Sequence, residues 1–227
     1  MFPLEQGTEA FGLPVFFNVN MKKRTIVYID GFNFYYRCLK GTPYKWLDLS
    51  MFVSKILPPE KHEILKIKFF TAKINKRISD PQAPNRQESY LKALENFCPN
   101  VEIIYGHFLS HSAMRPLTPP QEGWVNVMLT EEKGTDVNLA VHLLNDAWRN
   151  AYDCGVVVSN DSDLAEAMRL AQNQNKIIGW LVTGNQHPSQ LLSKIANFRK
   201  PIRKTILSIS QLPDNIPGTN IVKPKEW

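Results

Sequence analysis

The sequence predicts an α/β domain built on a mostly parallel sheet that is covered by helices on both faces. Strand-like runs alternate with segments of helical spacing along most of the 227 residues. The inner runs, such as 155–158, are apolar at every position, as expected for strands that are buried on both sides. Hydrophobic residues make up 43% of the chain, which is enough to form a sizeable core.

The first half of the chain contains three predicted strands and three predicted helices. β-Branched and aromatic runs predict strands over 25–29, 64–71 and 101–105. Helical spacing predicts helices over 32–39, from the N-cap Asp48 to about 57, and over 86–97. The first strand ends in Asp30-Gly31, which indicates a sharp exit from the sheet.

The second half continues this alternation after an irregular segment. Residues 110–122 are rich in proline and polar side chains, which predicts a surface loop or lid, and 124–129 predicts a short edge strand. A helix is expected from Thr135 or Asp136 to 148. The remaining elements are expected to be strands over 155–158 and 176–182, a helix that ends near 172, and a short helix over 188–195.

The same patterns divide the chain into three parts. Residues 1–20 precede a basic start to the first strand and are expected to be an N-terminal extension outside the fold. Residues 21–197 are expected to form the domain, and 198–227 a basic, proline-containing C-terminal tail.

Charge and cysteine content restrict the partners and the compartment. The net charge of +6 favours a polyanionic partner such as RNA, although charge alone is equally compatible with an ordinary soluble protein. The three cysteines are far apart and form no CxxC pair, which favours a reducing, cytoplasmic location. No membrane partner is expected because no apolar run is long enough to span a bilayer. A signal peptide is also not expected, because Glu5 and Glu9 stand where basic residues would be required.

Acidic residues follow two of the predicted apolar strands. Asp30 ends the first strand, Asp161 and Asp163 follow the strand over 155–158, and Asp136 opens the helix before that strand. If the two strands are neighbours, the four carboxylates converge at one edge of the sheet, where they repel each other unless a cation is present. Oxygen ligands of this kind suit Mg²⁺ or Mn²⁺.

Each aspartate also has an ordinary structural explanation. Asp136 could simply cap its helix, and Asp161 and Asp163 could do the same in solvent. The Asp30-Gly31 pair could be only a turn. The joint arrangement, more than any single residue, favours a metal site with all four aspartates as ligands and catalytic groups.

Five polar residues are candidates for supporting roles. Asn33 could orient a water or phosphate, Ser159 and Asn160 could hydrogen-bond the carboxylates, and Lys133 and Arg86 could contact substrate phosphate. Glu131 and Glu132 are expected to be a solvated pair, with ligation of a metal as the alternative.

Four segments of the chain carry a resemblance to a known family. They are YIDGFNFYY (28–36), RQESYLKAL (86–94), EKGTDVNLAVHLL (132–144) and YDCGVVVSNDSDLAEAM (152–168). In this order they resemble the NYN-domain proteins, a PIN-like group to which metal-dependent ribonuclease activity is attributed, from about residue 25 to about 195.

The resemblance implies a PIN-like three-layer α/β/α sandwich with Mg²⁺ or Mn²⁺ held by the four aspartates, and Asn33 matches the asparagine of the first motif. This chain departs from the family pattern at two places. Asn160 replaces the glycine of a Ser-Gly-Asp motif, and Leu164-Ala165-Glu166 stand where a phenylalanine with a nearby proline is common.

The function expected on these grounds is a metal-dependent endoribonuclease that hydrolyses phosphodiester bonds of single-stranded or structured RNA, with DNA also open as a substrate. The alternative is a non-catalytic NYN module that binds RNA or protein. A phosphatase or nucleotide-binding domain is disfavoured because the sequence has neither GxxxxGK[ST] nor GxGxxG. A homodimer is compatible with the sequence, which specifies no interface.

Overall fold

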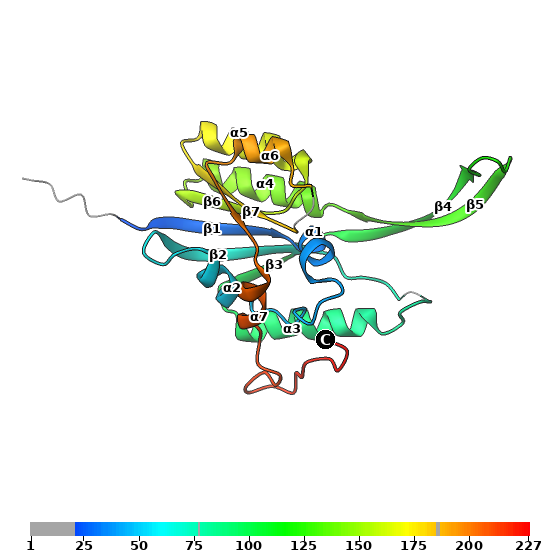
Figure 1. Ribbon diagram of the computed structural model, residues 1–227, viewed down its shortest axis with the longest axis horizontal. Helices are drawn as coiled ribbons and strands as arrows, with labels where there is room; N and C mark the ends of the chain where they lie inside the picture. The colour runs from blue at the N-terminus through cyan, green and yellow to red at the C-terminus, as the bar shows by residue number, and fades with distance from the viewer. Residues whose placement is uncertain (1–20, 77, 185–186) are drawn as a thin grey trace, which may run out of the picture.

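The computed structural model describes residues 21–76, 78–184 and 187–227 (Figure 1). The predicted N-terminal extension, residues 1–20, lies outside the described residues. The described chain forms a six-stranded sheet between two layers of helices, which confirms the predicted α/β/α architecture. None of its helices is long and apolar enough to cross a membrane.

The central sheet is parallel throughout and has the strand order β3-β2-β1-β6-β7-β8. Its strands are β1 (Lys23–Asp30), β2 (His62–Thr71), β3 (Val101–Tyr105), β6 (Cys154–Val158), β7 (Ile177–Val182) and β8 (Phe198–Pro201). The two strands that precede the aspartates, β1 and β6, are neighbours, with Ile29 opposite Val158. Their carboxyl ends therefore meet at the same edge of the sheet.

Helices cover the two faces of the sheet separately. One face packs against α2 (Leu49–Ile56), α3 (Ala83–Phe97) and α7 (Lys204–Ile209), and the other against α4 (Thr135–Trp148), α5 (Ala165–Asn173) and α6 (Gln190–Ile195) (Figure 1). Short helical segments follow two of the strands. After β1 come α1 (Gly31–Phe34) and the π-helical η1 (Tyr35–Leu39), and after β6 comes the 3₁₀ turn η2 (Ser162–Leu164), which leads into α5. Asp48 caps α2 as predicted, since its carboxylate accepts a 2.8 Å hydrogen bond from the Met51 N–H.

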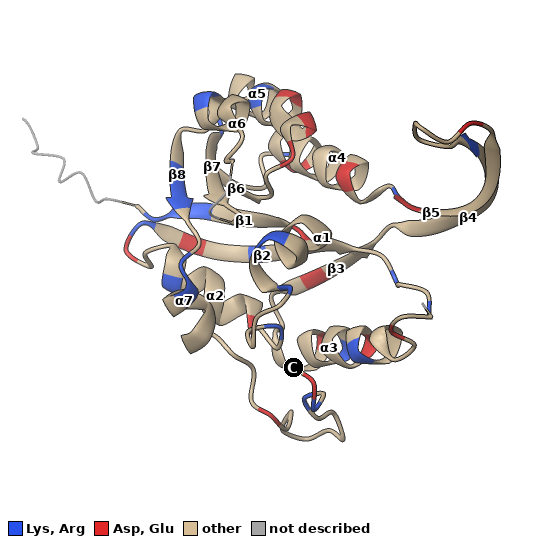
Figure 2. Cartoon of the chain, turned by 45° about the vertical axis from the view of Figure 1, so that its right-hand side comes forward, with Lys and Arg blue, Asp and Glu red and all other residues tan. Residues whose placement is uncertain are grey.

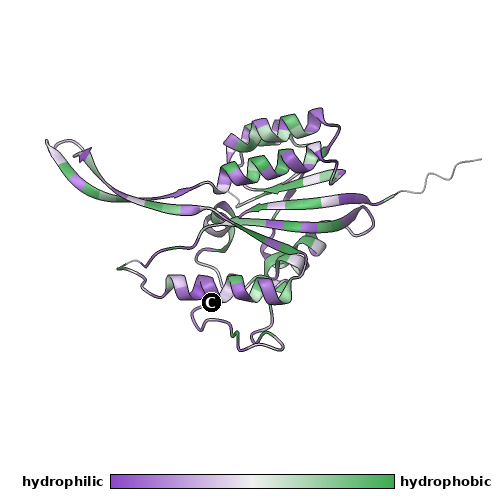
Figure 3. Cartoon of the chain, turned by 180° about the vertical axis from the view of Figure 1, so that it is seen from behind, coloured by the Kyte–Doolittle hydropathy of each residue, from purple (hydrophilic) through white to green (hydrophobic). Residues whose placement is uncertain are grey.

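A two-stranded antiparallel arm projects from the body of the domain (Figures 1 and 3). It consists of β4 (His107–Pro116) and β5 (Trp124–Lys133). The predicted strand over 124–129 is confirmed, but it extends to Lys133 and pairs with β4 in the arm. The predicted loop or lid over 110–122 is wrong up to Pro116, where β4 ends, and only 117–122 are irregular. Both faces of β4 are largely exposed, so this strand lacks the alternation of apolar and polar residues by which a half-buried strand is detected.

The C-terminal segment packs as part of the domain. β8 extends the sheet beside β7, and Ile202, Leu207 and Leu212 are buried in the core on the α2 side. The ring of Trp227 packs edge-on against Trp46, at 6.4 Å between centroids. Residues 198–227, predicted to form a tail, thus differ from that expectation because scattered apolar residues between the prolines anchor them.

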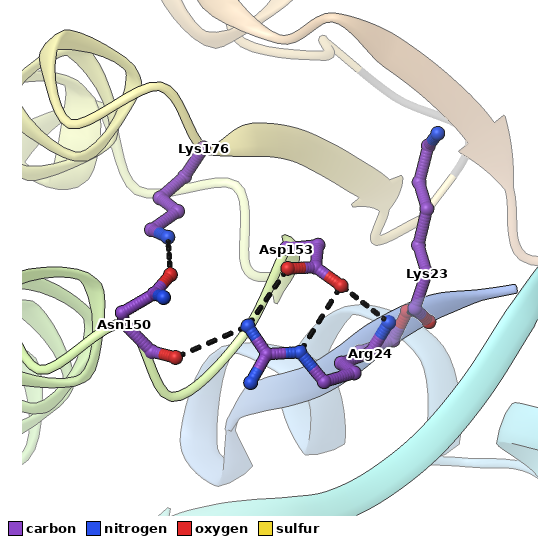
Figure 4. A network of polar contacts seen from close by, with 6 residues as sticks. Lys23, Arg24, Asn150, Asp153 and Lys176 are labelled. Carbon is purple, nitrogen blue, oxygen red and sulfur yellow. Dashed lines mark hydrogen bonds and ion pairs between the residues drawn. The ribbon is translucent and has the colours of Figure 1, made fainter. Parts of the chain in front are cut away.

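A polar network joins neighbouring strands at the end of the sheet opposite the aspartates (Figure 4). The Arg24 guanidinium binds the Asp153 carboxylate at 2.8 Å and donates to the Asn150 carbonyl at 3.2 Å. Lys176 donates to the Asn150 side chain. The network joins the starts of β1, β6 and β7, although half-exposed ion pairs of this kind contribute little to stability.

Candidate functional site

Four aspartates gather at the carboxyl edge of the sheet. Asp30 is the last residue of β1, Asp161 and Asp163 follow β6, and Asp136 is the second residue of α4. Figure 2 shows acidic residues at the start of α4 and near the start of α5 on the same side of the molecule. The charges of Asp30, Asp161 and Asp163 each raise the pKa of Asp136, so the four groups share one electrostatic environment.

Asp30 is the most deeply buried member of this cluster, with only 4% of its surface exposed. Burial raises its pKa, and the charges of Asp161 and Glu132 raise it further. Hydrogen bonds from the Asn33 N–H and the Ser159 hydroxyl, both 2.9 Å long, act in the opposite direction by stabilising the carboxylate. Burial thus disfavours the charged form of Asp30, and these two hydrogen bonds partly offset that cost.

Asp136 is an exposed residue whose carboxylate is shielded from water on the side that faces the cluster, and its pKa is raised. Burial raises its pKa to about 6, with help from the negative charges of Asp30, Asp161, Glu132 and Asp163. Burial and these four carboxylates all disfavour the ionised form of Asp136.

Ser159 hydrogen-bonds the Asp30 carboxylate, as the sequence predicted, and also the backbone of Asp161. Its hydroxyl donates to Asp30 at 2.9 Å and accepts from the Asp161 N–H at 3.1 Å. The indole of Trp180 on β7 donates to the Ser159 carbonyl at 2.6 Å. This contact fixes the turn after β6, and it was missed because nothing in the sequence relates a core tryptophan to that turn.

Asn33 and Asn160 position the loop without contacting a carboxylate through their side chains. The Asn33 side-chain oxygen accepts from the Asn160 N–H at 3.0 Å and from the Thr183 hydroxyl at 2.8 Å. The Asn160 amide binds the His187 carbonyl at 3.1 Å and the Ser189 N–H at 2.8 Å. The prediction that Asn160 hydrogen-bonds the carboxylates is corrected, since it ties the turn after β6 to the segment before α6.

The remaining candidates fall in different places. Lys133 forms a 2.8 Å surface ion pair with Glu131. Glu132 is not a solvated partner of Glu131, because its carboxylate accepts from the Thr135 N–H at 3.0 Å and from the Thr135 hydroxyl at 2.6 Å. This bonding holds Glu132 beside the aspartates. Arg86 lies on α3, on the other side of the sheet from α4, and is paired with Asp80.

The donor chemistry of the cluster suits a hard divalent cation. Asp30, Asp136, Asp161, Asp163 and Glu132 offer carboxylate oxygens, the ligands that such an ion prefers, and burial together with neighbouring negative charges raises the pKa of Asp30 and of Asp136. Among the described residues, no group of three or more His, Cys, Asp or Glu side chains is arranged to hold a metal ion as it stands. Asp161 directs one oxygen to the Asp163 N–H at 3.0 Å, and Asp30 uses both of its oxygens as acceptors.

Gly31, the residue after Asp30, permits a close approach between α1 and β2. A Cβ atom at this position would lie 2.6 Å from the Phe70 carbonyl and 2.8 Å from the Phe69 ring. We expect Gly31→Ala to lower the free energy of unfolding by about 1–3 kcal/mol, as for other overpacked sites. Urea denaturation measures this change. Wild-type stability in Gly31→Ala would contradict this expectation and show that the contact relaxes freely. Gly41→Ala is not a suitable control, because Gly41 has a positive φ that disfavours alanine.

Comparisons with known proteins agree with the motifs and the fold. The NYN domain family model matches residues 24–202. The chain is 34% identical to 6-hydroxy-3-succinoylpyridine 3-monooxygenase HspA of Pseudomonas putida (strain DSM 28022 / S16), over 90% of this chain and 75% of that protein. The crystal structure of VPA0982, a protein of unknown function from Vibrio parahaemolyticus RIMD 2210633, shares the fold with a TM-score of 0.52 and 18% identity, over 81% of this chain and 94% of that one. The chain belongs to the NYN domain family.

Proposed function

We propose that the protein is a metal-dependent endoribonuclease whose centre is the carboxylate cluster at the carboxyl edge of the sheet. The observation that carries the proposal is the convergence of Asp30, Asp136, Asp161 and Asp163 at this edge, where burial and the charges of the other three aspartates raise the pKa of Asp136. A divalent cation would relieve this unfavourable charge. The family supports a nuclease-like activity in general terms. The choice of RNA and of Mg²⁺ or Mn²⁺ is part of the proposal.

The four aspartates would hold the ion, with Glu132 beside them. When bound, Mg²⁺ or Mn²⁺ would supply Lewis-acid stabilisation of the charge that develops on the phosphodiester. Ser159 would keep the Asp30 carboxylate oriented through its 2.9 Å hydrogen bond. Asn33 would hold the turn that carries Asp161 by accepting from the Asn160 N–H, and Lys133 at the base of the arm would bind RNA phosphate.

The test is cleavage of labelled single-stranded and structured RNA by the pure protein with Mn²⁺, with Mg²⁺ and with EDTA. We expect cleavage that requires metal and is lost in Asp161→Asn, with circular dichroism as the check on folding. RNA that is bound but never cut would favour the non-catalytic module. Equal cleavage with EDTA, or by Asp161→Asn, would contradict the proposed site.

A second candidate is the oxygenation of an aromatic acid. It is favoured by the 34% identity to a relative that is named as a 6-hydroxy-3-succinoylpyridine 3-monooxygenase. Oxygen uptake that depends on 6-hydroxy-3-succinoylpyridine, in the presence of a supplied reductant, would support this activity. Oxygen uptake that persists in Asp161→Asn would place this reaction away from the carboxylate cluster.

A further inference from the structure

A cavity of about 240 Å³ lies on the α3 side of the sheet, next to the first strand's exit. Its walls come from α1 and η1, the end of β2, the first half of α3 and the C-terminal Trp227. Pockets for drug-sized ligands have volumes of about 300–1,000 Å³, so this cavity suits a single planar ring system better than a larger molecule.

Aromatic side chains form a large part of the cavity lining. Tyr35, Tyr36, Tyr90 and Trp227 all contribute to it. Tyr35 and Tyr36 are in edge contact at 5.3 Å between centroids, and 49% of the Tyr36 surface is exposed. Aromatic faces of this kind stack on planar rings, and stacking tolerates any base because every base has a π-face.

Basic side chains border the same cavity. Lys40, Lys45 and Arg86 line it, and the Lys40 ammonium lies 5.0 Å from the centroid of the Tyr36 ring. Arg86 is paired with Asp80, which is also part of the lining. An aromatic ring that carries a nearby anionic group matches both features, and one nucleotide of a nucleic-acid strand has this chemistry.

The cavity and the carboxylate cluster lie next to each other at consecutive residues of the chain. Gly31 lines the cavity, and the preceding residue, Asp30, belongs to the cluster. We propose that the cavity binds the base of a nucleotide adjacent to the scissile phosphate, with Tyr36 stacking on the base and Lys40 facing the phosphate. This assignment rests on the proposed ribonuclease function, because the cluster defines which phosphate is scissile.

The first experiment measures binding of single-stranded RNA in EDTA, so that cleavage does not interfere. We expect Tyr36→Ala to raise the dissociation constant by about 5- to 100-fold, the usual effect of removing one stacked base contact. Ala83→Trp, at the start of α3 where Ala83 lines the cavity, is expected to weaken binding similarly by filling the space. Trp148→Ala is the matched control, because Trp148 is a 69% exposed aromatic residue of α4 that does not line the cavity.

A second arm identifies what the cavity recognises. Nucleoside monophosphates should compete with the RNA for the wild-type protein, whereas ribose 5-phosphate, which has no base, should not. Competition by nicotinate alone would overturn the proposal in favour of a free aromatic acid. Wild-type RNA affinity in both Tyr36→Ala and Ala83→Trp would also overturn it.

The two proposals fail in distinguishable ways. If the cavity variants lose RNA binding but the wild-type protein never cuts RNA, the cavity stands as a base-binding site, and the nuclease activity fails together with the placement of that base beside a scissile phosphate. If the wild-type protein cuts RNA and both cavity variants cut it with unchanged affinity and unchanged cleavage positions, the nuclease activity stands and the base site fails.

Discussion

Asp136→Asn is expected to abolish RNA cleavage and, at the same time, to make the metal-free protein more stable at neutral pH. The substitution removes one of the charges that repel each other at the sheet edge, since Asp30 and Asp161 both raise the pKa of Asp136. The rate should fall by more than about 100-fold, because residues that only orient metal ligands already contribute 10- to 100-fold. Opposite effects on activity and stability are typical of charged functional sites.

The gain in stability should depend on pH in a defined direction. The folded-state pKa of Asp136 is raised to about 6 from an ordinary 3.8, so the folded protein binds this proton more tightly than the unfolded chain does. The stability that the wild-type protein derives from protonated Asp136 is complete below pH 3.8 and is lost as the pH rises through 6. Asp136→Asn should therefore show its largest advantage above pH 6 and little advantage near pH 4.

Melting temperatures of the wild-type protein and Asp136→Asn, measured in EDTA from pH 4 to pH 8, test this prediction. Asp214→Asn is the control, because Asp214 is an exposed carboxylate paired with Lys223 and is absent from the groups that shift Asp136. Mn²⁺ should stabilise the wild-type protein more than Asp136→Asn. A variant that is less stable than wild type at pH 8 in EDTA would show that Asp136 is held by favourable contacts and not strained by its neighbours.

The position of the aspartates was predictable because it depends on backbone topology. Asp30 and Asp161 each follow an apolar run, and parallel neighbouring strands place such residues at one edge of the sheet. The adjacency of β1 and β6 was the only assumption, and the structure confirms it. Ser159 was predictable for the same reason, since it lies between the end of β6 and Asp161.

Features that depend on side-chain contacts between distant segments were not predictable. Glu132 lies beside the cluster because it bonds to Thr135, but an acidic pair before a helix is more often solvated. Asn160 interacts with His187 and Ser189, which are more than 25 residues away. The length of the arm depends on pairing between β4 and β5, and the exposed faces of β4 give no periodic signal.

Lys68→Met is expected to cause the largest loss of stability among single substitutions of charged residues on β2. Lys68 is only 6% exposed, and its ammonium lies 2.6 Å from the Asp146 carboxylate of α4. The same carboxylate oxygen accepts a 2.7 Å hydrogen bond from the Tyr28 hydroxyl. Removing the lysine would leave Asp146 buried without its counter-charge, which typically costs about 3–5 kcal/mol. That is a large fraction of the roughly 5–15 kcal/mol by which domains are stable.

Lys66 provides a matched control on the same strand. It also pairs with an acidic residue, Glu102, at 2.9 Å, but its side chain is 48% exposed. Lys66→Met should cost no more than about 1 kcal/mol, because water screens an exposed pair. Urea denaturation at pH 7 compares the two variants directly. Equal losses would mean that burial does not make the Lys68–Asp146 pair more important for stability than the exposed Lys66–Glu102 pair.

A combined substitution separates the effect of the charge from that of the contact between β2 and α4. Lys68→Met, Asp146→Leu and Tyr28→Phe together remove the ammonium, the carboxylate and the hydroxyl that depend on each other. This triple variant should be more stable than Lys68→Met alone, because replacing a whole buried ionic group by apolar residues is often neutral. α4 also carries Asp136 at its first turn. If the triple variant regains stability but cleaves RNA with altered metal dependence, the buried ion pair sets the position of α4 relative to the carboxylate cluster.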